Sequence, residues 1–349
     1  MTKVQNISKS DYLKRINCVS SAFLKRNNCV SDASLDTLVQ LRKTNQEAPP
    51  LLDKKNLTKR ARSKHISNKI TLSLVDLNSP LKKAYWNTFY CNETLIQNGQ
   101  TITGKYCKNR WCSTCNRIRT AQLIKGYTEP LSNIDDKHFV TLTVPNVRAD
   151  ELKIQIETML SEFGRIKDTF RKRKTPIIGI RKLECTYNSN SNTYHPHFHI
   201  IVSGKHIAIE IVKEWLERFP DTNNLAQDVR AADDNSVHEL FKYFTKIATY
   251  SKIDKTRKIH IVSLDTIFRA MKGKRVFQPM GIKKYVPEDI EEIQSQEYDI
   301  EEQFVEWKWN EEYSNWIDIQ TGECLTDYEP SPGVIELLKN IVISHPPPS

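Results

Sequence analysis

The chain has 349 residues, a formal net charge of +10 and eight cysteines. Its length suits one sizeable core with an accessory region. No apolar run approaches the roughly 18 residues that a membrane span needs, and the first residues lack the apolar segment of a secretion signal. We therefore expect a cytoplasmic protein with no membrane partner. In that reducing compartment, cysteines indicate metal ligands or buried thiols rather than disulfides.

The charge is distributed unevenly along the chain. Residues 1–70 hold 15 Lys and Arg against 5 Asp and Glu, whereas residues 286–349 hold 2 against 16. A basic body is typical of proteins that bind nucleic acid, because Lys and Arg displace counterions from the phosphates. A basic surface without such a partner is the alternative. The acidic C-terminal region would repel DNA.

We expect four regions, described here in chain order. They are a basic, mostly flexible arm (1–70), a cysteine-rich module (85–130), a mixed domain (137–275) and an acidic, aromatic-containing C-terminal region (286–349). Periodicity predicts strands at 139–144, 177–187, 194–203 and 227–230, and helices at 150–173, 207–218, 236–250 and 264–271. This order predicts an α+β fold with a central, mainly antiparallel sheet flanked by helices and preceded by the cysteine-rich module.

The cysteine-rich module has the spacing of a zinc site. Cys107, Cys112 and Cys115 form a Cys-x4-Cys-x2-Cys pattern, and Cys91 lies sixteen residues before the first of them. Four thiolates in a tetrahedral arrangement are a common structural Zn²⁺ site. Buried free thiols are the alternative. A basic helix is expected directly after Cys115, where it could contact phosphates.

The run Tyr194–Ser203 carries two histidines on one face of a predicted strand. Phe198 alternates with apolar neighbours toward the core, so His197 and His199 project together from the opposite face. Two imidazoles held on a rigid strand can bind a divalent metal ion. A lone pair of this kind is more often structural, so its neighbours decide the interpretation.

A carboxylate on the preceding strand supplies a third ligand. The turn cluster at 188–192 predicts an antiparallel hairpin, which places Glu184 opposite His197 or His199. Two neutral imidazoles and one carboxylate leave coordination positions open on Mg²⁺ or Mn²⁺ for a phosphate oxygen. An ordinary surface ion pair of Glu184 with Arg181 or Lys182 is the alternative.

The predicted helix 236–250 carries a second polar group. At about 100° per residue, four side chains fall in one narrow stripe: Glu239, Tyr243, Lys246 and Tyr250. A tyrosine with a carboxylate one turn before it and a lysine one turn after it can act as a nucleophile near a metal ion or cation. A solvated helix face with a half-exposed tyrosine explains the same pattern.

Three segments together resemble a known family, the plasmid-type rolling-circle replication initiators of the HUH endonuclease superfamily. The segments are 139–146, 195–202 and 239–246, in the order of the family's motifs. The His-hydrophobic-His triplet corresponds to His197 and His199, and the Glu-x-x-Lys-Tyr pattern runs from Glu239 to Tyr243. The resemblance covers about residues 85–275, and implies an HUH-type fold with an RRM-like sheet.

The resemblance also implies a reaction and a set of partners. Tyr243 would nick one strand of a single-stranded or cruciform origin, leaving a 5′-phosphotyrosyl link and a 3′-OH primer. Glu239 would activate water for the final cleavage, Lys246 would stabilise charge, and Tyr250 is the alternative nucleophile. A host helicase and polymerase are the implied protein partners. A transposase or relaxase of the same superfamily, or a non-catalytic zinc-dependent DNA-binding protein, are the competing hypotheses.

Overall fold

A computed structural model describes residues 54–99, 101–241, 246, 248–250, 256–285 and 304–343. The chain divides into two compact units, Met1–Pro50 and Leu51–Ser349, and all the described residues belong to the second. Most of the predicted basic arm therefore lies outside the described residues. Among those residues, no helix is both long enough and apolar enough to cross a membrane.

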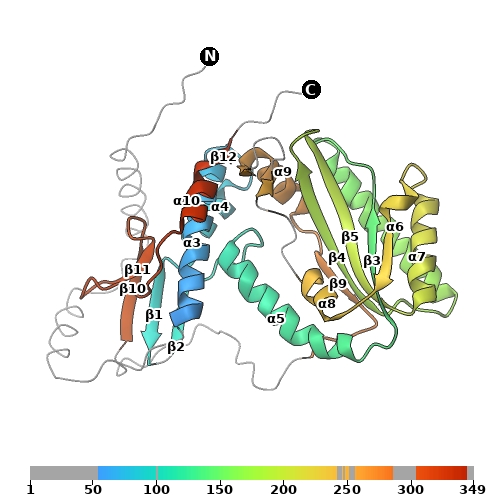
Figure 1. Ribbon diagram of the computed structural model, residues 1–349, viewed down its shortest axis with the longest axis horizontal. Coiled ribbons are helices and arrows are strands. Elements are labelled where there is room, and N and C mark those ends of the chain that lie inside the picture. The colour runs from blue at the N-terminus through green and yellow to red at the C-terminus, as the bar shows by residue number, and fades with distance from the viewer. Residues whose placement is uncertain are drawn as a thin grey trace, which may run out of the picture. The chain divides into compact units, whose positions relative to one another are not determined.

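The centre of the fold is a five-stranded sheet with the order β6-β3-β5-β4-β9. Its strands are β3 (Lys137–Thr143), β4 (Gly179–Asn188), β5 (Thr193–Ser203), β6 (Asp228–Ala231) and β9 (Phe277–Met280). Every neighbouring pair in this sheet is antiparallel. The α+β class with a mainly antiparallel sheet is therefore confirmed, and Figure 1 shows the sheet with its flanking helices.

One face of this sheet packs against the larger apolar core. Helices α6 (Leu152–Lys172) and α7 (Lys205–Arg218) cover it, and α9 (Ile261–Met271) packs against α6. The buried side chains of β5 on this face include Phe198, Ile200 and Val202. The predicted alternation of β5 is thus confirmed, and it turns His197 and His199 to the opposite face.

The opposite face is only partly covered. Helix α5 (Ser113–Ser132) and the short helix α8 (Asp234–Leu240) pack over one end of it, on the other side of the sheet from α6 and α7 (Figure 1). Their contacts form a small apolar cluster that includes Tyr127, Phe139 and Phe241. The polar positions of β3, β4 and β5 lie beside this cluster.

A second, four-stranded sheet joins parts of the chain that are far apart in sequence. Its order is β11-β10-β1-β2, with β1 (Thr94–Asn98), β2 (Thr101–Gly104), β10 (Phe304–Asn310) and β11 (Asn315–Asp318). The acidic C-terminal region therefore adds two strands beside the cysteine-rich module. Trp309 and Trp316 fill the core of this sheet, whereas Tyr313 is exposed.

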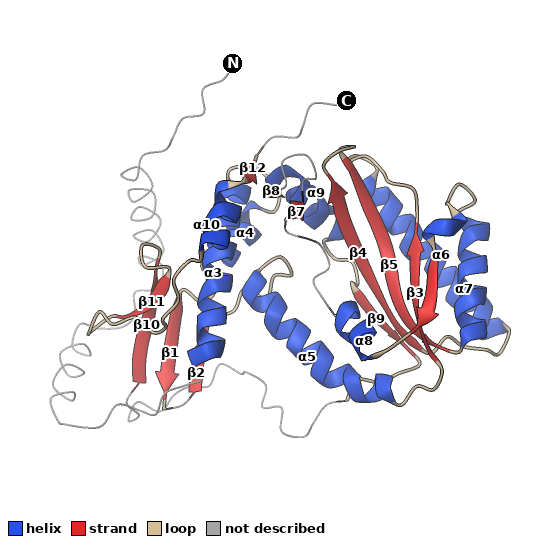
Figure 2. Cartoon of the chain, in the orientation of Figure 1, coloured by secondary structure: helices blue, strands red, loops and turns tan. Residues whose placement is uncertain are grey.

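Helix α3 (Lys54–Val75) connects the small sheet to the rest of the fold. Figure 2 shows it between that sheet and α5, and it also contacts α4 (Lys82–Phe89), α9 and α10 (Pro332–Lys339). Residues 54–70 are thus helical and not part of a flexible arm. The buried face of α3 includes polar side chains such as Lys64 and Asn68. Its buried residues therefore do not form a regular apolar pattern in the sequence.

Helix α8 contains only the first part of the predicted helix 236–250, and the described residues between Phe241 and Tyr250 are not helical. Helix α8 begins with a capping box between Asp233 and Ser236 and ends at Leu240. Tyr250 lies in β7 (Thr249–Tyr250), which pairs with β8 (Arg257–His260), and β8 also pairs with β12 (Ile341–Val342). A residue in a strand ladder cannot continue the helix, so Tyr250 does not share a helical stripe with Glu239. Strand pairing overrides the helical period here.

Candidate metal centres

The β4–β5 hairpin has the predicted register. Glu184 pairs with His197 and Lys182 pairs with His199 across the two strands. Because side chains directly opposite in a sheet share a face, these four side chains project on the side away from the α6–α7 core. The turn of this hairpin contains Asn192 with a φ of 50°, a conformation that asparagine adopts readily.

Glu184, His197 and His199 form a compact group of ligand atoms. One atom from each side chain lies within 4.8 Å of the other two. The Nε2 atom of His199 is 3.7 Å from Oε2 of Glu184, and the two imidazole rings stand almost perpendicular with centroids 4.8 Å apart. Two imidazoles and a carboxylate at this separation can hold one divalent cation and leave further coordination positions open.

Hydrogen bonds fix the two imidazole rings. Nδ1 of His197 lies 3.0 Å from the carbonyl oxygen of His195, and Nδ1 of His199 lies 3.3 Å from Oγ1 of Thr141. Bonds at Nδ1 leave Nε2 as the ligand atom, an arrangement typical of metal-binding histidines. His195 itself is turned to Oδ1 of Asn146 at 2.8 Å.

Burial and a neighbouring ammonium favour the unprotonated forms of these side chains, which are the forms that bind a cation. Desolvation lowers the pKa of His197 and of His199 to about 4, so both rings are neutral near pH 7. Burial opposes ionisation of Glu184, but the Lys182 ammonium and the two imidazoles outweigh it and hold the pKa of the carboxyl below its usual value. Nζ of the fully buried Lys182 donates to Oε2 of Glu184 at 2.7 Å.

We expect the metal-free protein to lose stability as the pH falls from about 6.5 toward 4. The pKa of His195, like that of His197 and His199, is about 4 in the folded protein because of burial. An unfolded imidazole binds its proton near pH 6.5, so protonation in this window favours the unfolded chain. Urea unfolding curves at a series of pH values measure the loss.

The His199→Asn variant should reduce this acid sensitivity, whereas His206→Asn, at an exposed position on α7, should leave it unchanged. Equal acid sensitivity in the wild-type protein and in His199→Asn would contradict the burial argument. Binding of Mn²⁺ should weaken only slightly as the pH falls to about 5.5. Two imidazole ligands with ordinary pKa values would lose about 100-fold in affinity at that pH.

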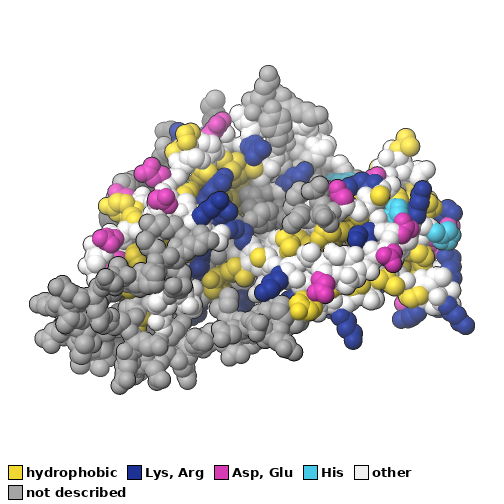
Figure 3. All heavy atoms as spheres, turned by 60° about the horizontal axis from the view of Figure 1, so that its bottom comes forward, with side chains coloured by type: hydrophobic (Ala, Val, Ile, Leu, Met, Phe, Trp, Pro, Cys, Tyr) yellow, Lys and Arg dark blue, Asp and Glu magenta, His cyan; other side chains and the backbone are white. Residues whose placement is uncertain are grey.

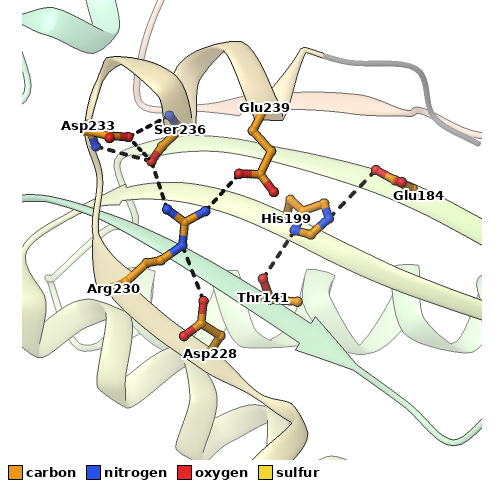
Figure 4. Close-up of polar contacts among 8 residues, drawn as sticks. All are labelled: Thr141, Glu184, His199, Asp228, Arg230, Asp233, Ser236 and Glu239. Atoms are coloured by element: carbon orange, nitrogen blue, oxygen red, sulfur yellow. Dashed lines mark hydrogen bonds and ion pairs between the residues drawn. The ribbon is translucent and has the colours of Figure 1, made fainter.

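Glu239 lies beside the His/Glu group, held by an arginine. Figure 4 shows Glu239 reaching from α8 over the sheet on the side of His199. Its Oε2 accepts a hydrogen bond of 2.9 Å from Arg230 of β6. The structure thus brings Glu184, His197, His199 and Glu239 together on one side of the sheet.

The structure does not place the other residues of the predicted catalytic set in this group. Tyr243 lies outside the described residues. Lys246 is exposed and belongs to no helix or strand, and Tyr250 lies in β7. Their proposed roles therefore rest on the sequence pattern.

From the sequence, Lys182 is expected only as a possible ion-pair partner of Glu184, which the 2.7 Å contact confirms, and Arg230 has no predicted role. Lys182 is two residues before Glu184, so strand periodicity already places it on the same face. Arg230 lies on β6, and only the pairing of Phe139 with Arg230 brings it to this side. That pairing is a tertiary contact, which the local pattern does not contain.

The four predicted zinc ligands also lie together. One sulfur from each of Cys91, Cys107, Cys112 and Cys115 lies within 4.8 Å of the others. The Sγ atoms of Cys91 and Cys115 are 3.5 Å apart, and those of Cys107 and Cys115 are 3.6 Å apart. Tetrahedral Zn–S bonds of about 2.3 Å require sulfur separations of roughly 3.8 Å, so the cluster fits a tetrathiolate metal site.

The surroundings of the cluster fit a charged metal–thiolate group. Lys64 of α3 is 2% exposed, and its Nζ donates to the carbonyl oxygen of Phe89 at 2.7 Å. Burial lowers the pKa of Lys64, and negative charge on Cys91 and Cys112 opposes this shift. A buried ammonium is costly unless negative charge lies nearby, and four thiolates around Zn²⁺ carry a net negative charge. Within the described residues, Cys185 is buried in the sheet core and Cys324 is exposed, away from this cluster.

Comparison with known proteins agrees with this combination of fold and ligand groups. Residues 99–216 match the Rep_1 family, described as replication protein. The match covers the cysteine-bearing segment from Cys107 onward, β3, the β4–β5 hairpin and most of α7. In sequence, the chain is therefore similar to replication proteins of the Rep type.

Relatives extend the match beyond this domain. A protein named "Protein rep" from Staphylococcus aureus is 27% identical over 187 residues, which cover 47% of this chain and 80% of that protein. A "Protein rep" from Bacillus amyloliquefaciens is 27% identical over 222 residues (53% of this chain, 64% of that protein). One from a Bacillus species is 26% identical over 241 residues (57% and 78%). No solved structure matches. The resemblance to plasmid-type rolling-circle replication initiators is confirmed.

Proposed function

We propose that this protein nicks one DNA strand at a plasmid replication origin and later rejoins it, with residues 137–275 as the nicking domain. The single observation that carries the proposal is the group formed by Glu184, His197 and His199, whose ligand atoms lie within 4.8 Å of one another. Mg²⁺ or Mn²⁺ bound there would polarise the scissile phosphate. Glu239, which Arg230 holds on the side of His199, would act on the same phosphate.

The reaction assigns one role to each polar residue. The phenol oxygen of Tyr243 attacks phosphorus, forming the tyrosyl–phosphate bond while the bond to the 3′ oxygen breaks. The phenol proton is lost, and the 3′ oxygen takes up a proton to become the 3′-OH primer. Lys246 stabilises the phenolate or phosphate charge. In the terminating cleavage, Glu239 accepts a proton from the attacking water. Rejoining is the reversal of the first step.

Origin DNA, single-stranded or extruded as a cruciform, is the proposed substrate. Figure 3 shows Lys and Arg side chains distributed over the displayed face of the described residues. Lys125 of α5 is exposed and available to phosphates. Two other basic residues of that helix have structural partners: Arg117 donates to the carbonyl oxygen of Lys59, and Arg119 to that of Lys108. A host helicase and polymerase would act on the nicked product.

We assign Zn²⁺ to the four cysteines as a structural ion. The sulfur separations and the buried Lys64 support this choice. Its role is to hold the cysteine-rich module (85–130) against α3, so that α5 is placed beside the central sheet. The acidic C-terminal region contributes β10 and β11 to the same body.

A plasmid-nicking assay tests the proposal. Incubated with Mn²⁺, the wild-type protein should convert supercoiled plasmid that carries its origin to the open circular form. The Glu184→Gln and His199→Ala variants should be slower by about 10²-fold or more, because the metal ion is lost. His206→Ala, at an exposed histidine on α7, is the matched control and should keep full activity. Equal nicking by all four proteins, or nicking that survives EDTA unchanged, would remove the metal-dependent mechanism.

A further inference from the structure

Arg230 contacts three polar side chains at once on the open face of the central sheet. Its Nη2 donates to Oε2 of Glu239 at 2.9 Å, and its Nη1 donates to Oγ of Ser236 at 3.2 Å. Its Nε lies 3.5 Å from Oδ2 of Asp228. Figure 4 shows the guanidinium between these groups, with Glu239 on the side of His199. One side chain thus links the edge strand β6 with helix α8.

The sheet holds the plane of the guanidinium. Its central carbon lies 4.4 Å from the centroid of the Phe139 ring, and Phe139 pairs with Arg230 in the β3–β6 register. An arginine stacked on an aromatic face keeps its planar fork of donors in a fixed orientation. The side chain is 42% exposed, so the outer edge of the fork faces solvent and α8.

The two guanidinium donors of Arg230 bind α8 at its first turn and near its last residue. Ser236 belongs to the capping box that starts the helix, since its backbone N–H donates to Oδ1 of Asp233 at 2.8 Å. Glu239 lies three residues later, near the last residue of the helix. A helix of only seven residues has little stability of its own, so such external bonds determine how it is rotated.

We propose that Arg230 is a positioning residue for Glu239, and that it supports the water-dependent cleavage in preference to the tyrosine-dependent nick. This inference rests on the proposed function. By holding α8 and the carboxylate together, Arg230 keeps Glu239 over the His199 side of the metal centre. Lysine keeps the charge but cannot bond Ser236 and Glu239 through a planar fork, so it should restore the function only in part.

The test compares Arg230→Gln, Arg230→Lys, Glu239→Gln and the double variant Arg230→Gln/Glu239→Gln. With a labelled origin oligonucleotide and Mn²⁺, the covalent adduct reports the nick and the released 5′-phosphate product reports hydrolysis. We expect Arg230→Gln to lower hydrolysis about 10-fold or more while adduct formation changes by less than about 3-fold. Arg230→Lys should be intermediate, and the double variant should equal Glu239→Gln. Arg257→Gln, at an exposed arginine on β8, is the control.

Equal losses in both products, or losses that multiply in the double variant, would overturn the proposal. Hydrogen exchange of the intact protein gives a second readout that needs no activity. Arg230→Gln should speed exchange in the α8 amides and leave α7 unchanged. Unchanged exchange in α8 would also overturn it. A wild-type protein that forms no adduct contradicts the nicking function, whereas the exchange result still decides whether Arg230 holds α8.

Discussion

Replacing Tyr243 with phenylalanine should abolish the covalent protein–DNA adduct, with a loss of about 10³-fold or more. The substitution removes one oxygen and leaves the aromatic ring. In the proposed mechanism, Tyr243 supplies the phenol oxygen that bonds to phosphorus, and phenylalanine has none. The measurement is denaturing electrophoresis after incubation with Mn²⁺ and a labelled single-stranded origin oligonucleotide, in which a shifted, labelled protein band reports the adduct.

The Tyr250→Phe variant is the matched control for this prediction. Tyr250 lies in β7, where its backbone pairs with Arg257 of β8, so it is not on α8 with Glu239. We expect Tyr250→Phe to form the adduct at the wild-type rate. An adduct lost only in Tyr250→Phe would move the nucleophile to that residue. Adducts in both variants would contradict a single-tyrosine mechanism, and no adduct with the wild-type protein would contradict the nicking function.

The Cys112→Ser variant should lose its zinc and melt at a temperature lower by about 10 °C or more. Cys112 is 1% exposed, so the variant leaves three thiols and a buried hydroxyl around the metal position. Wild-type protein should contain one zinc per chain, and the variant close to none. Metal analysis and thermal unfolding measured on the same samples check both parts.

We expect the loss of zinc to disturb the packing of the small sheet as well. Asn92 follows the ligand Cys91, and its carbonyl oxygen accepts a hydrogen bond of 2.8 Å from the indole of Trp316. Tryptophan fluorescence of Cys112→Ser should therefore shift toward that of the unfolded protein. Cys324→Ser, at an exposed cysteine, is the matched control and should behave as wild type. Zinc-free wild-type protein with unchanged stability would contradict a structural zinc site.

The histidine hairpin was the part of the molecule most open to sequence analysis. Its strands alternate with a period of two, and a polar turn cluster fixes where they fold back. These two local features suffice to place Glu184 opposite His197, as the register confirms. The cysteine spacing was equally informative, because four ligands of one metal ion must converge. The first prediction depends on a short segment of the chain, and the second on a metal ion that the four cysteines would share.

The parts that sequence analysis missed depend on contacts between distant segments. Helix α3 buries Lys64 and Asn68 along with its apolar residues, so its buried face does not appear in a hydrophobic period. Helix α8 ends at Leu240 although the helical period continues, while Tyr250 pairs with β8. The pairing of β10 with β1 carries no local signal at all. Tertiary packing determined each of these outcomes.

The shared sheet of β1 and β10 has a consequence for synthesis of the protein on the ribosome. The hydrogen bond between Trp316 and Asn92 joins residues 224 positions apart. The strands that carry the histidines are complete long before β10 emerges from the ribosome. The central sheet can therefore fold while the module around Cys91 still lacks half of its own sheet. A long sequence separation of this kind slows folding and leaves strand edges open in the meantime. Chains that stop before β10 would therefore carry the histidines and the cysteines but present an unpaired β1 edge to chaperones and proteases.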